Sequence, residues 1–164
     1  MKQHRDAYRE AIVALVPQLR AFARFLARDA VRADDLVQDT VLRALERQDA
    51  WTPGSDLRAW IFRVLRNLFL DQQRRRRVEQ KGLAIIEMPD VAEPTQPGRD
   101  ALHDLGAAIT TLPAAQREAL ILVAAMELDI AEAAAITGVP VGTVKARVSR
   151  ARAALALTFG GRSS

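Results

Sequence analysis

The sequence predicts an all-α protein made of two small helical domains joined by a flexible linker. Apolar residues make up 49% of the 164 residues, and aromatic residues make up only 5%. Ala and Leu dominate the apolar set, and both favour helices, whereas strands are rich in aromatic and β-branched residues. A chain of this length suffices for one ordinary domain or two small ones.

Hydrophobic periodicity and capping residues define the helices before the linker. The expected ranges are 6–28, 30–47 and about 56–77. Pro17 either kinks the first helix or starts a second one. Asp29 suits the N-cap of the second range, and Ser55 that of the third.

Four shorter helices are expected after the linker, over residues 100–111, 113–126, 130–137 and 141–157. Pro113 suits the first position of the second of these helices. Asp129 and Glu132 have the spacing of a capping box, and Gly138 suits the end of the helix that they begin.

Residues 79–99 are expected to form the linker. Three prolines and two glycines lie between Gly82 and Gly98, and this stretch carries three acids and no base. Because such a segment cannot hold a long helix, the expected domains are residues 1–78 and 100–164. Fully extended, the linker spans about 70 Å at roughly 3.3–3.6 Å per residue.

The net charge of +4 is unevenly distributed. Residues 1–77 carry 16 basic and 10 acidic residues, and residues 78–112 carry 2 basic and 6 acidic residues. Residues 113–164 carry 6 basic and 4 acidic residues. Of the 24 basic residues 21 are Arg, the type suited to phosphate and base-edge contacts. The basic blocks suggest nucleic acid, and a solvated surface is the alternative that composition leaves open.

Several function classes are not expected. The chain has no cysteine, which excludes disulfides and thiol catalysis, and its two histidines, His4 and His103, lie far apart. The sequence contains no nucleophile–base constellation, glycine-rich phosphate loop or metal-ligand cluster, so we expect no enzyme and no cofactor. No apolar run reaches the roughly 18 residues of a membrane span, and the polar N-terminus is unlike a signal peptide. We therefore expect an intracellular protein without membrane insertion.

The last two expected helices, with a turn at Gly138, have the helix-turn-helix pattern. Val144, Val148, Ala151 and Leu155 form the buried stripe of the second helix. Its opposite face carries small residues and Arg150, which allow close approach to a major groove and contact with a guanine edge. The candidate DNA contacts are Gly142, Thr143, Lys145, Ala146, Arg147, Ser149, Arg150 and Arg152. An ordinary helical hairpin with a basic helix is the alternative.

The long third helix carries Trp60, Arg63 and Asn67 on one ridge. Aromatic and amide side chains beside Arg suit unstacked bases, and Trp51 could form one wall of a pocket for an extruded base. The alternative is that Trp60 is a core residue. The expected core stripe is Leu57, Ile61, Val64, Leu65 and Leu68, and we expect Phe62 and Leu70 to point away from it.

The second helix carries an acidic face of Asp35, Gln38, Asp39 and Leu42, and we expect Val37, Val41, Ala44 and Leu45 to face inward. An acidic patch with an apolar centre suits docking to a basic protein partner, and a solvated charged face is the alternative.

Four segments resemble regions 2.2, 2.3–2.4, 4.1 and 4.2 of the bacterial extracytoplasmic-function (ECF) sigma factors of the sigma-70 family. These segments are ADDLVQDTVLRAL, LRAWIFRVLRNLFLDQQRRRR, LPAAQREALILV and GVPVGTVKARVSRAR. The resemblance covers most of the chain, in the right order and with the right gap. It implies a cytoplasmic bacterial protein that directs RNA polymerase to promoters and is not itself an enzyme.

The resemblance also implies roles for individual surfaces. The face with Asp35, Gln38, Asp39 and Leu42 is expected to bind the β′ clamp helices of core RNA polymerase, whose β flap is a further expected contact. The 141–152 helix is expected to read the −35 element of promoter DNA. The residues expected to take the melted −10 strand are Trp51, Ser55, Trp60, Arg63, Arg66, Asn67 and Arg74.

An anti-sigma factor is the expected regulator, with Phe62 and Leu70 as candidate contacts. A stand-alone helix-turn-helix regulator that binds operators as a dimer is the alternative function. It explains the last 25 residues but neither the 51–77 region nor the acidic face.

Overall fold

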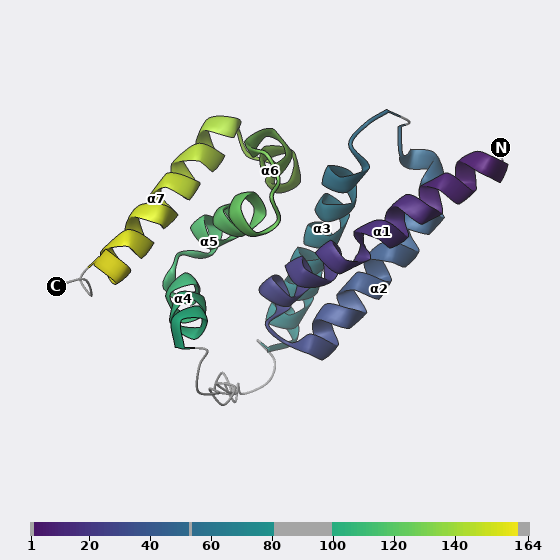
Figure 1. Cartoon of the computed structure of the whole chain (residues 1–164). Coiled ribbons are helices and arrows are strands. Elements are labelled where there is room, and N and C mark those ends of the chain that lie inside the picture. The colour runs from purple at the N-terminus through teal and green to yellow at the C-terminus, as the bar shows by residue number, and fades with distance from the viewer. Residues whose placement is uncertain (1, 53, 81–99, 161–164) are drawn as a thin grey trace.

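The computed structural model describes residues 2–52, 54–80 and 100–160. Its first unit consists of α1 (Lys2–Ala27), α2 (Ala30–Glu46) and α3 (Leu57–Gln80), with a short 3₁₀ turn at Gln48–Ala50. Figure 1 shows these three helices packed together on the side of the molecule that carries the N-terminus. The larger buried side chains of this unit are Tyr8, Ile12, Leu19, Phe22, Leu36, Val37, Ile61, Phe62, Leu65 and Leu68.

The N-caps of α2 and α3 are both aspartates, and the one at α3 differs from the prediction. Asp29 caps α2 as predicted, because its side chain accepts hydrogen bonds from two backbone N–H groups of the first turn. Asp56, not Ser55, caps α3: its Oδ1 accepts from the N–H groups of Arg58 at 3.0 Å and Ala59 at 3.3 Å. A carboxylate also interacts favourably with the positive end of the helix dipole, which a hydroxyl does not.

Pro17 lies inside one continuous α1, so it does not start a second helix. At the other end of the unit, Glu79 and Gln80 still belong to α3. The remainder of the predicted linker, residues 81–99, lies outside the described residues.

The second unit consists of α4 (Asp100–Thr111), α5 (Ala114–Leu120), α6 (Ile130–Thr137) and α7 (Val141–Gly160). The helix predicted over 113–126 is not uniform, because α5 passes into a π-helical segment, Ile121–Ala125. There the N–H of Met126 bonds to the carbonyl of Ile121 five residues earlier, at 2.9 Å. The buried residues of this unit include Leu112, Leu120, Leu122, Leu128, Ala133, Ile136, Val144, Val148 and Ala151.

The α6 helix begins and ends as the sequence predicts. Asp129 and Glu132 form a complete capping box, with the N–H of Glu132 donating to Oδ1 of Asp129 at 2.7 Å. Gly138 ends the helix in the left-handed conformation, with φ of +72°. Glycine adopts this conformation without the steric cost of a Cβ, so the turn that directs α7 is fixed locally.

The two units pack against each other, and the main contact lies between α3 and α6. In Figure 1, α6 lies beside the start of α3, while α7 lies on the outer side of the second unit. The buried hydrophobic residues of the described ranges, with the exception of Ala108, belong to one apolar cluster that spans both units. No helix of the described ranges is long and apolar enough to cross a membrane.

The prediction that Phe62 points away from the core is wrong. Phe62 is fully buried, and its ring stacks on that of Phe22 with 5.3 Å between the centroids. Since both α1 and α2 pack against α3, its buried face is wider than a single helical stripe. Leu70 is half-buried at the boundary between the units.

The inward face of α2 also differs from the prediction. Leu45 is exposed, and Leu36 and Thr40 are buried instead. The Thr40 hydroxyl donates to the carbonyl of Leu36 at 2.7 Å, which satisfies it inside the core. Leu36, Thr40 and Ala44 recur every four residues, and this stripe turns Leu45 towards solvent.

We predict that Phe62→Ala lowers the free energy of unfolding of the first unit by about 3–5 kcal/mol, because it removes a buried ring and leaves a cavity. Urea unfolding followed by tryptophan fluorescence measures this, since both tryptophans, Trp51 and Trp60, lie in the first unit. The control is Val13→Ala on exposed α1 surface, which should change stability by less than about 0.5 kcal/mol. Equal effects of the two substitutions would contradict the buried position of Phe62.

Candidate nucleic-acid interface

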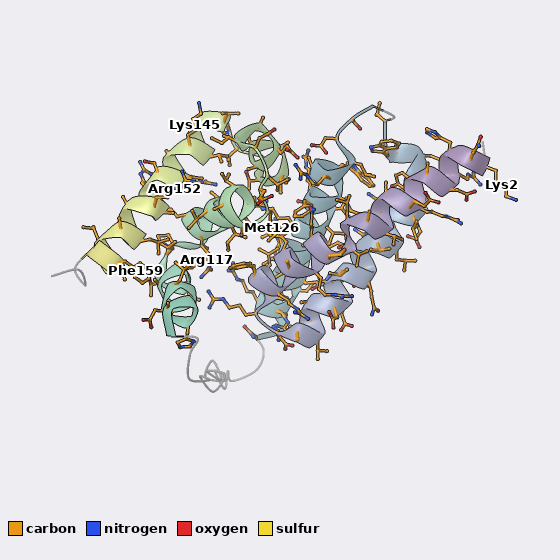
Figure 2. All side chains as sticks on the ribbon, in the orientation of Figure 1. Lys2, Arg117, Met126, Lys145, Arg152 and Phe159 are labelled. Atoms are coloured by element: carbon orange, nitrogen blue, oxygen red, sulfur yellow. The ribbon has the colours of Figure 1, made fainter. Side chains whose placement is uncertain are left out.

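The α6–turn–α7 arrangement presents one face of α7 to solvent. Val144, Val148 and Ala151 are buried beneath α7, as predicted, and Leu155 is half-buried. Of the candidate DNA contacts, five are exposed and lie along the outer surface: Gly142, Lys145, Ser149, Arg150 and Arg152. Figure 2 shows Lys145 and Arg152 on α7 at the edge of the molecule away from α1 and α2.

Three other predicted contacts on α7 are half-buried, namely Thr143, Ala146 and Arg147. Arg147 lines a cleft of about 330 Å³ between the two units, together with Phe69 of α3 and Arg117 of α5. Burial, followed by the charge of Arg28, lowers the pKa of Arg117. Positive charge therefore gathers both on the outer face of α7 and inside the cleft.

The three residues of the predicted α3 ridge differ in exposure. Arg63 and Asn67 are exposed, and Trp60 is half-buried with its backbone N–H bonded to the carbonyl of Asp56 at 3.1 Å. Trp60 packs against the core of the first unit. The half-buried indole, followed along the helix by two exposed polar side chains, has part of its aromatic surface open to solvent and part fixed by packing.

Trp51, the predicted wall of a base pocket, packs against α1. Its ring lies 5.4 Å from that of Tyr8 and 6.4 Å from that of His4, both on α1. The Tyr8 hydroxyl donates to the carbonyl of Ala44 at 2.8 Å, and burial raises the pKa of this hydroxyl. Trp51 Nε1 is buried without a hydrogen-bond partner among the described residues. The loop before α3 is therefore anchored to α1 and α2 through this aromatic cluster.

The remaining candidates for the −10 strand differ in accessibility. Ser55 is exposed, and its hydroxyl bonds to the carbonyl of Thr52. Arg74 is exposed and lies 3.6 Å from the carboxylate of Asp71. Arg66 faces the second unit instead, where its Nε lies 3.0 Å from the Glu118 carboxylate of α5.

The acidic face of α2 is exposed along its length. Asp35, Gln38 and Asp39 are exposed, and the exposed fraction of Leu42 is 57%. Asp39 and Leu42 also border a groove whose far wall is formed by α3 residues, including Asp71 and Arg75. This combination of exposed carboxylates and an exposed leucine is typical of a protein-docking surface rather than of a DNA surface.

Sequence reasoning missed the contacts between the units. Arg58 of α3 makes a bidentate ion pair with Glu132 of α6. The Arg58 Nη2 donates to Oε1 of Glu132 at 2.8 Å, and the Arg58 Nε donates to Oε2 at 3.1 Å. No local signal reveals a pair separated by 74 positions. Within the described residues, no group of three potential metal ligands comes together.

Comparison with known proteins places the chain in a family. The profile of sigma-70 region 2 matches residues 11–79, and that of sigma-70 region 4 matches residues 102–155. The ECF RNA polymerase sigma factor EcfG of Rhodopseudomonas palustris is 48% identical over 157 residues, which cover 92% of this chain and 83% of EcfG. The chain belongs to the ECF sigma factors of RNA polymerase. It therefore acts in transcription initiation as a non-enzymatic polymerase subunit.

Other sigma factors are similar to this chain in sequence or in fold. SigC of Mycobacterium tuberculosis is 35% identical over 136 residues, which cover 80% of this chain and 74% of SigC. The sigma factor RpoE of Bartonella quintana, solved in complex with the anti-sigma factor NepR, superposes with a TM-score of 0.78 at 40% identity over 94% of this chain and 97% of RpoE. CnrH, solved in complex with the cytosolic domain of CnrY, superposes with a TM-score of 0.70 at 27% identity, over 99% of this chain and 96% of CnrH.

We predict that the cap at Asp129 holds the start of α6 in this sigma factor. Asp129→Ala should lower the stability of the second unit by about 1 kcal/mol, because it removes the acceptor of the Glu132 N–H, whereas Asp129→Ser should keep most of it. Thermal unfolding followed by far-ultraviolet circular dichroism compares the three proteins. Identical midpoints for the alanine and serine variants would argue against the cap.

Proposed function

We propose that this ECF sigma factor directs RNA polymerase to promoters through three separate surfaces. The unit that binds core polymerase and the −10 element ends with α3 at Gln80, residues 100–164 form the unit that binds the −35 element, and residues 81–99 join them. The observation that carries the proposal is the match to the sigma-70 regions. These regions carry the α3 ridge with exposed Arg63 and Asn67, an exposed Arg-bearing face on α7 and an exposed acidic face on α2.

The α7 surface is proposed to read the −35 element in the major groove. Gly142 and Ser149 are small and exposed, so the helix can approach the base edges closely. Arg150, which follows Ser149, is also exposed. Its guanidinium can donate hydrogen bonds to the two acceptors on the major-groove edge of a guanine. Lys145 and Arg152 are placed to contact the flanking phosphates.

The α3 ridge is proposed to capture the melted −10 strand. Trp60 offers an aromatic surface for a base, while Arg63 and Asn67 offer donors for base edges and phosphates. Trp51 is proposed to act through the loop that it anchors, and Ser55, Arg66 and Arg74 to contact the strand. Stacking of single bases is worth about 1–3 kcal/mol each, which helps to hold the strand open.

The acidic face of α2 is proposed to bind the β′ clamp helices, and the second unit to contact the β flap. Each unit alone binds DNA weakly, and polymerase makes the binding bivalent by fixing the distance between them. Because polymerase and promoter are in the bacterial cytoplasm, the sigma factor is proposed to act there. A stand-alone regulator does not account for the match to sigma-70 region 2.

An anti-sigma factor is proposed as the regulator. The support is that the similar sigma factor of Bartonella quintana was solved with the anti-sigma factor NepR. Leu70, half-buried at the cleft between the units, is a candidate contact. Phe62 is not, because it is fully buried.

The proposed function is tested by mixing the purified chain with core RNA polymerase that lacks any sigma factor. Co-elution from a sizing column, followed by run-off transcription over a genomic promoter library, should give new sequence-selective transcripts. Those transcripts would supply the −35 and −10 elements. A folded chain that neither co-elutes nor supports transcription would contradict the proposal.

We predict that Arg150→Ala lowers holoenzyme affinity for the cognate promoter, since one good contact to a base pair is worth about 1–3 kcal/mol of discrimination. Competition between the cognate promoter and the same promoter with a scrambled −35 element measures the preference, defined as the ratio of the two affinities. For the variant this ratio should fall towards one. The control is Arg9→Ala, which removes an exposed Arg of α1 and should leave the preference unchanged. An equal loss on both promoters would instead identify Arg150 as a phosphate contact.

We predict that the double reversal Asp35→Lys and Asp39→Lys weakens binding to core polymerase by about tenfold or more, because it places like charges against a basic partner. Fluorescence anisotropy of the labelled sigma factor titrated with core polymerase gives the Kd. Asp6→Lys with Glu10→Lys makes the same charge change on exposed α1 surface and serves as the control. If both pairs weaken binding equally, net charge rather than this face explains the effect.

A further inference from the structure

Two aromatic residues near the start of α1 pack on the loop before α3. The ring centroid of Trp51 lies 5.4 Å from that of Tyr8 and 6.4 Å from that of His4. Both distances fall in the range of about 4.5–7 Å over which aromatic rings interact favourably. His4 and Tyr8 precede residues 11–79, the range that matches sigma-70 region 2. The family match therefore assigns no role to the part of α1 that contacts this loop.

Tyr8 also fixes the place where the loop begins. Its side chain is buried, and its hydroxyl donates to the carbonyl of Ala44 at 2.8 Å. Ala44 lies in the last turn of α2, where backbone carbonyls lack partners within the helix. Figure 1 shows the end of α2 beside the start of α1. Tyr8 thus binds the end of α2 through its hydroxyl and Trp51 through its ring.

The orientation of the Trp51 indole depends on packing. Its Nε1 is buried without a hydrogen-bond partner among the described residues. Its backbone N–H bonds to the carbonyl of Gln48 at 3.3 Å, which is long for a hydrogen bond of this type. Because no side-chain hydrogen bond orients the indole, the rings of His4 and Tyr8 and the adjoining core set its position.

The turn that follows Trp51 is exposed and has a defined shape. Thr52, Gly54 and Ser55 are exposed, and the N–H of Ser55 bonds to the carbonyl of Thr52 at 3.1 Å. Gly54 has a φ of +89°, which glycine adopts without the steric cost of a Cβ. Asp56 then caps α3. The exposed turn therefore lies between a packed indole at one end and a capped helix at the other.

We propose that His4 and Tyr8 are positioning residues for recognition of the −10 element. They hold Trp51, and Trp51 holds the exposed turn in the position at which a melted base is captured. This inference rests on the proposed function of the loop and extends it to the start of α1. A preformed turn loses less conformational entropy on binding, and a looser turn accommodates more bases and so discriminates less between them.

The test compares two double variants of the full chain with the parent. His4→Ala with Tyr8→Phe removes one exposed ring and one hydroxyl, while the buried ring at position 8 stays in the core. The matched control is Gln3→Ala with Thr40→Val. Gln3 is an exposed residue of α1, and the Thr40 hydroxyl, like that of Tyr8, is buried and donates to a carbonyl of α2, at 2.7 Å. Both variants lose similar groups, but only the first loses contacts that lead to Trp51.

The first measurement does not depend on transcription. Trp60→Phe, introduced into all three proteins, leaves Trp51 as the only tryptophan. Quenching of its fluorescence by acrylamide should rise about twofold or more in the His4 and Tyr8 variant, because the indole loses an aromatic neighbour and the fixed end of α2. The control should be quenched like the parent.

The second measurement uses holoenzyme made with chains that retain Trp60. The −10 preference is the ratio of open-complex formation on the cognate promoter to that on the same promoter with a substituted −10 element. It should fall about fivefold in the His4 and Tyr8 variant, the factor that corresponds to one lost ring contact or hydrogen bond. The preference for the −35 element and the Kd for core polymerase should stay unchanged, whereas a general loss of stability would lower transcription from every promoter alike.

Each contrary result has a distinct meaning. Unchanged quenching of Trp51 in the His4 and Tyr8 variant would overturn the anchoring of the loop by α1. Increased quenching with an unchanged −10 preference would overturn the role of α1 in recognition, as would an equal fall in preference in the control. A parent holoenzyme without any −10 preference would contradict the proposed function of the loop, while the quenching result would still show whether α1 holds Trp51.

Discussion

The packing of α3 against both units is the constraint on which the rest of the structure depends. One side of this helix places Phe62 against Phe22 in the first core, and another side places Arg58 and Arg66 against the second unit. The ridge of Trp60, Arg63 and Asn67 is left at the surface. Because one helix serves the core, the contact between units and the proposed −10 surface, any movement of the second unit changes what α3 offers to DNA.

Features set by a few neighbouring residues could be predicted from the sequence. The cap at Asp29, the capping box of Asp129 and Glu132, and the left-handed Gly138 all follow from side chains within one helical turn. The exposed faces of α2 and α7 follow from helical periodicity for the same reason. The choice of Asp56 over Ser55 as the cap of α3 was ambiguous, because adjacent positions offered two suitable acceptors.

Features set by tertiary packing could not be predicted. A helical wheel places Phe62 relative to one stripe, but it does not say that a second helix covers the adjacent face. Trp51 was expected as one wall of a pocket for an extruded base, and the sequence did not reveal that its ring packs on Tyr8 of α1. The partners of Arg58 and Arg66 lie 74 and 52 positions away, so neither periodicity nor motif spacing identifies them.

Glu132 belongs both to the start of α6 and to the contact between the two units. Its carboxylate contributes to the capping box of α6 and also binds Arg58. The capping box depends only on Asp129 and Glu132, which both belong to the start of α6, and so it persists when Arg58 moves away. The Arg58–Glu132 pair therefore concerns how α3 lies against α6, while the turn at Gly138 sets the direction of α7 from within the second unit.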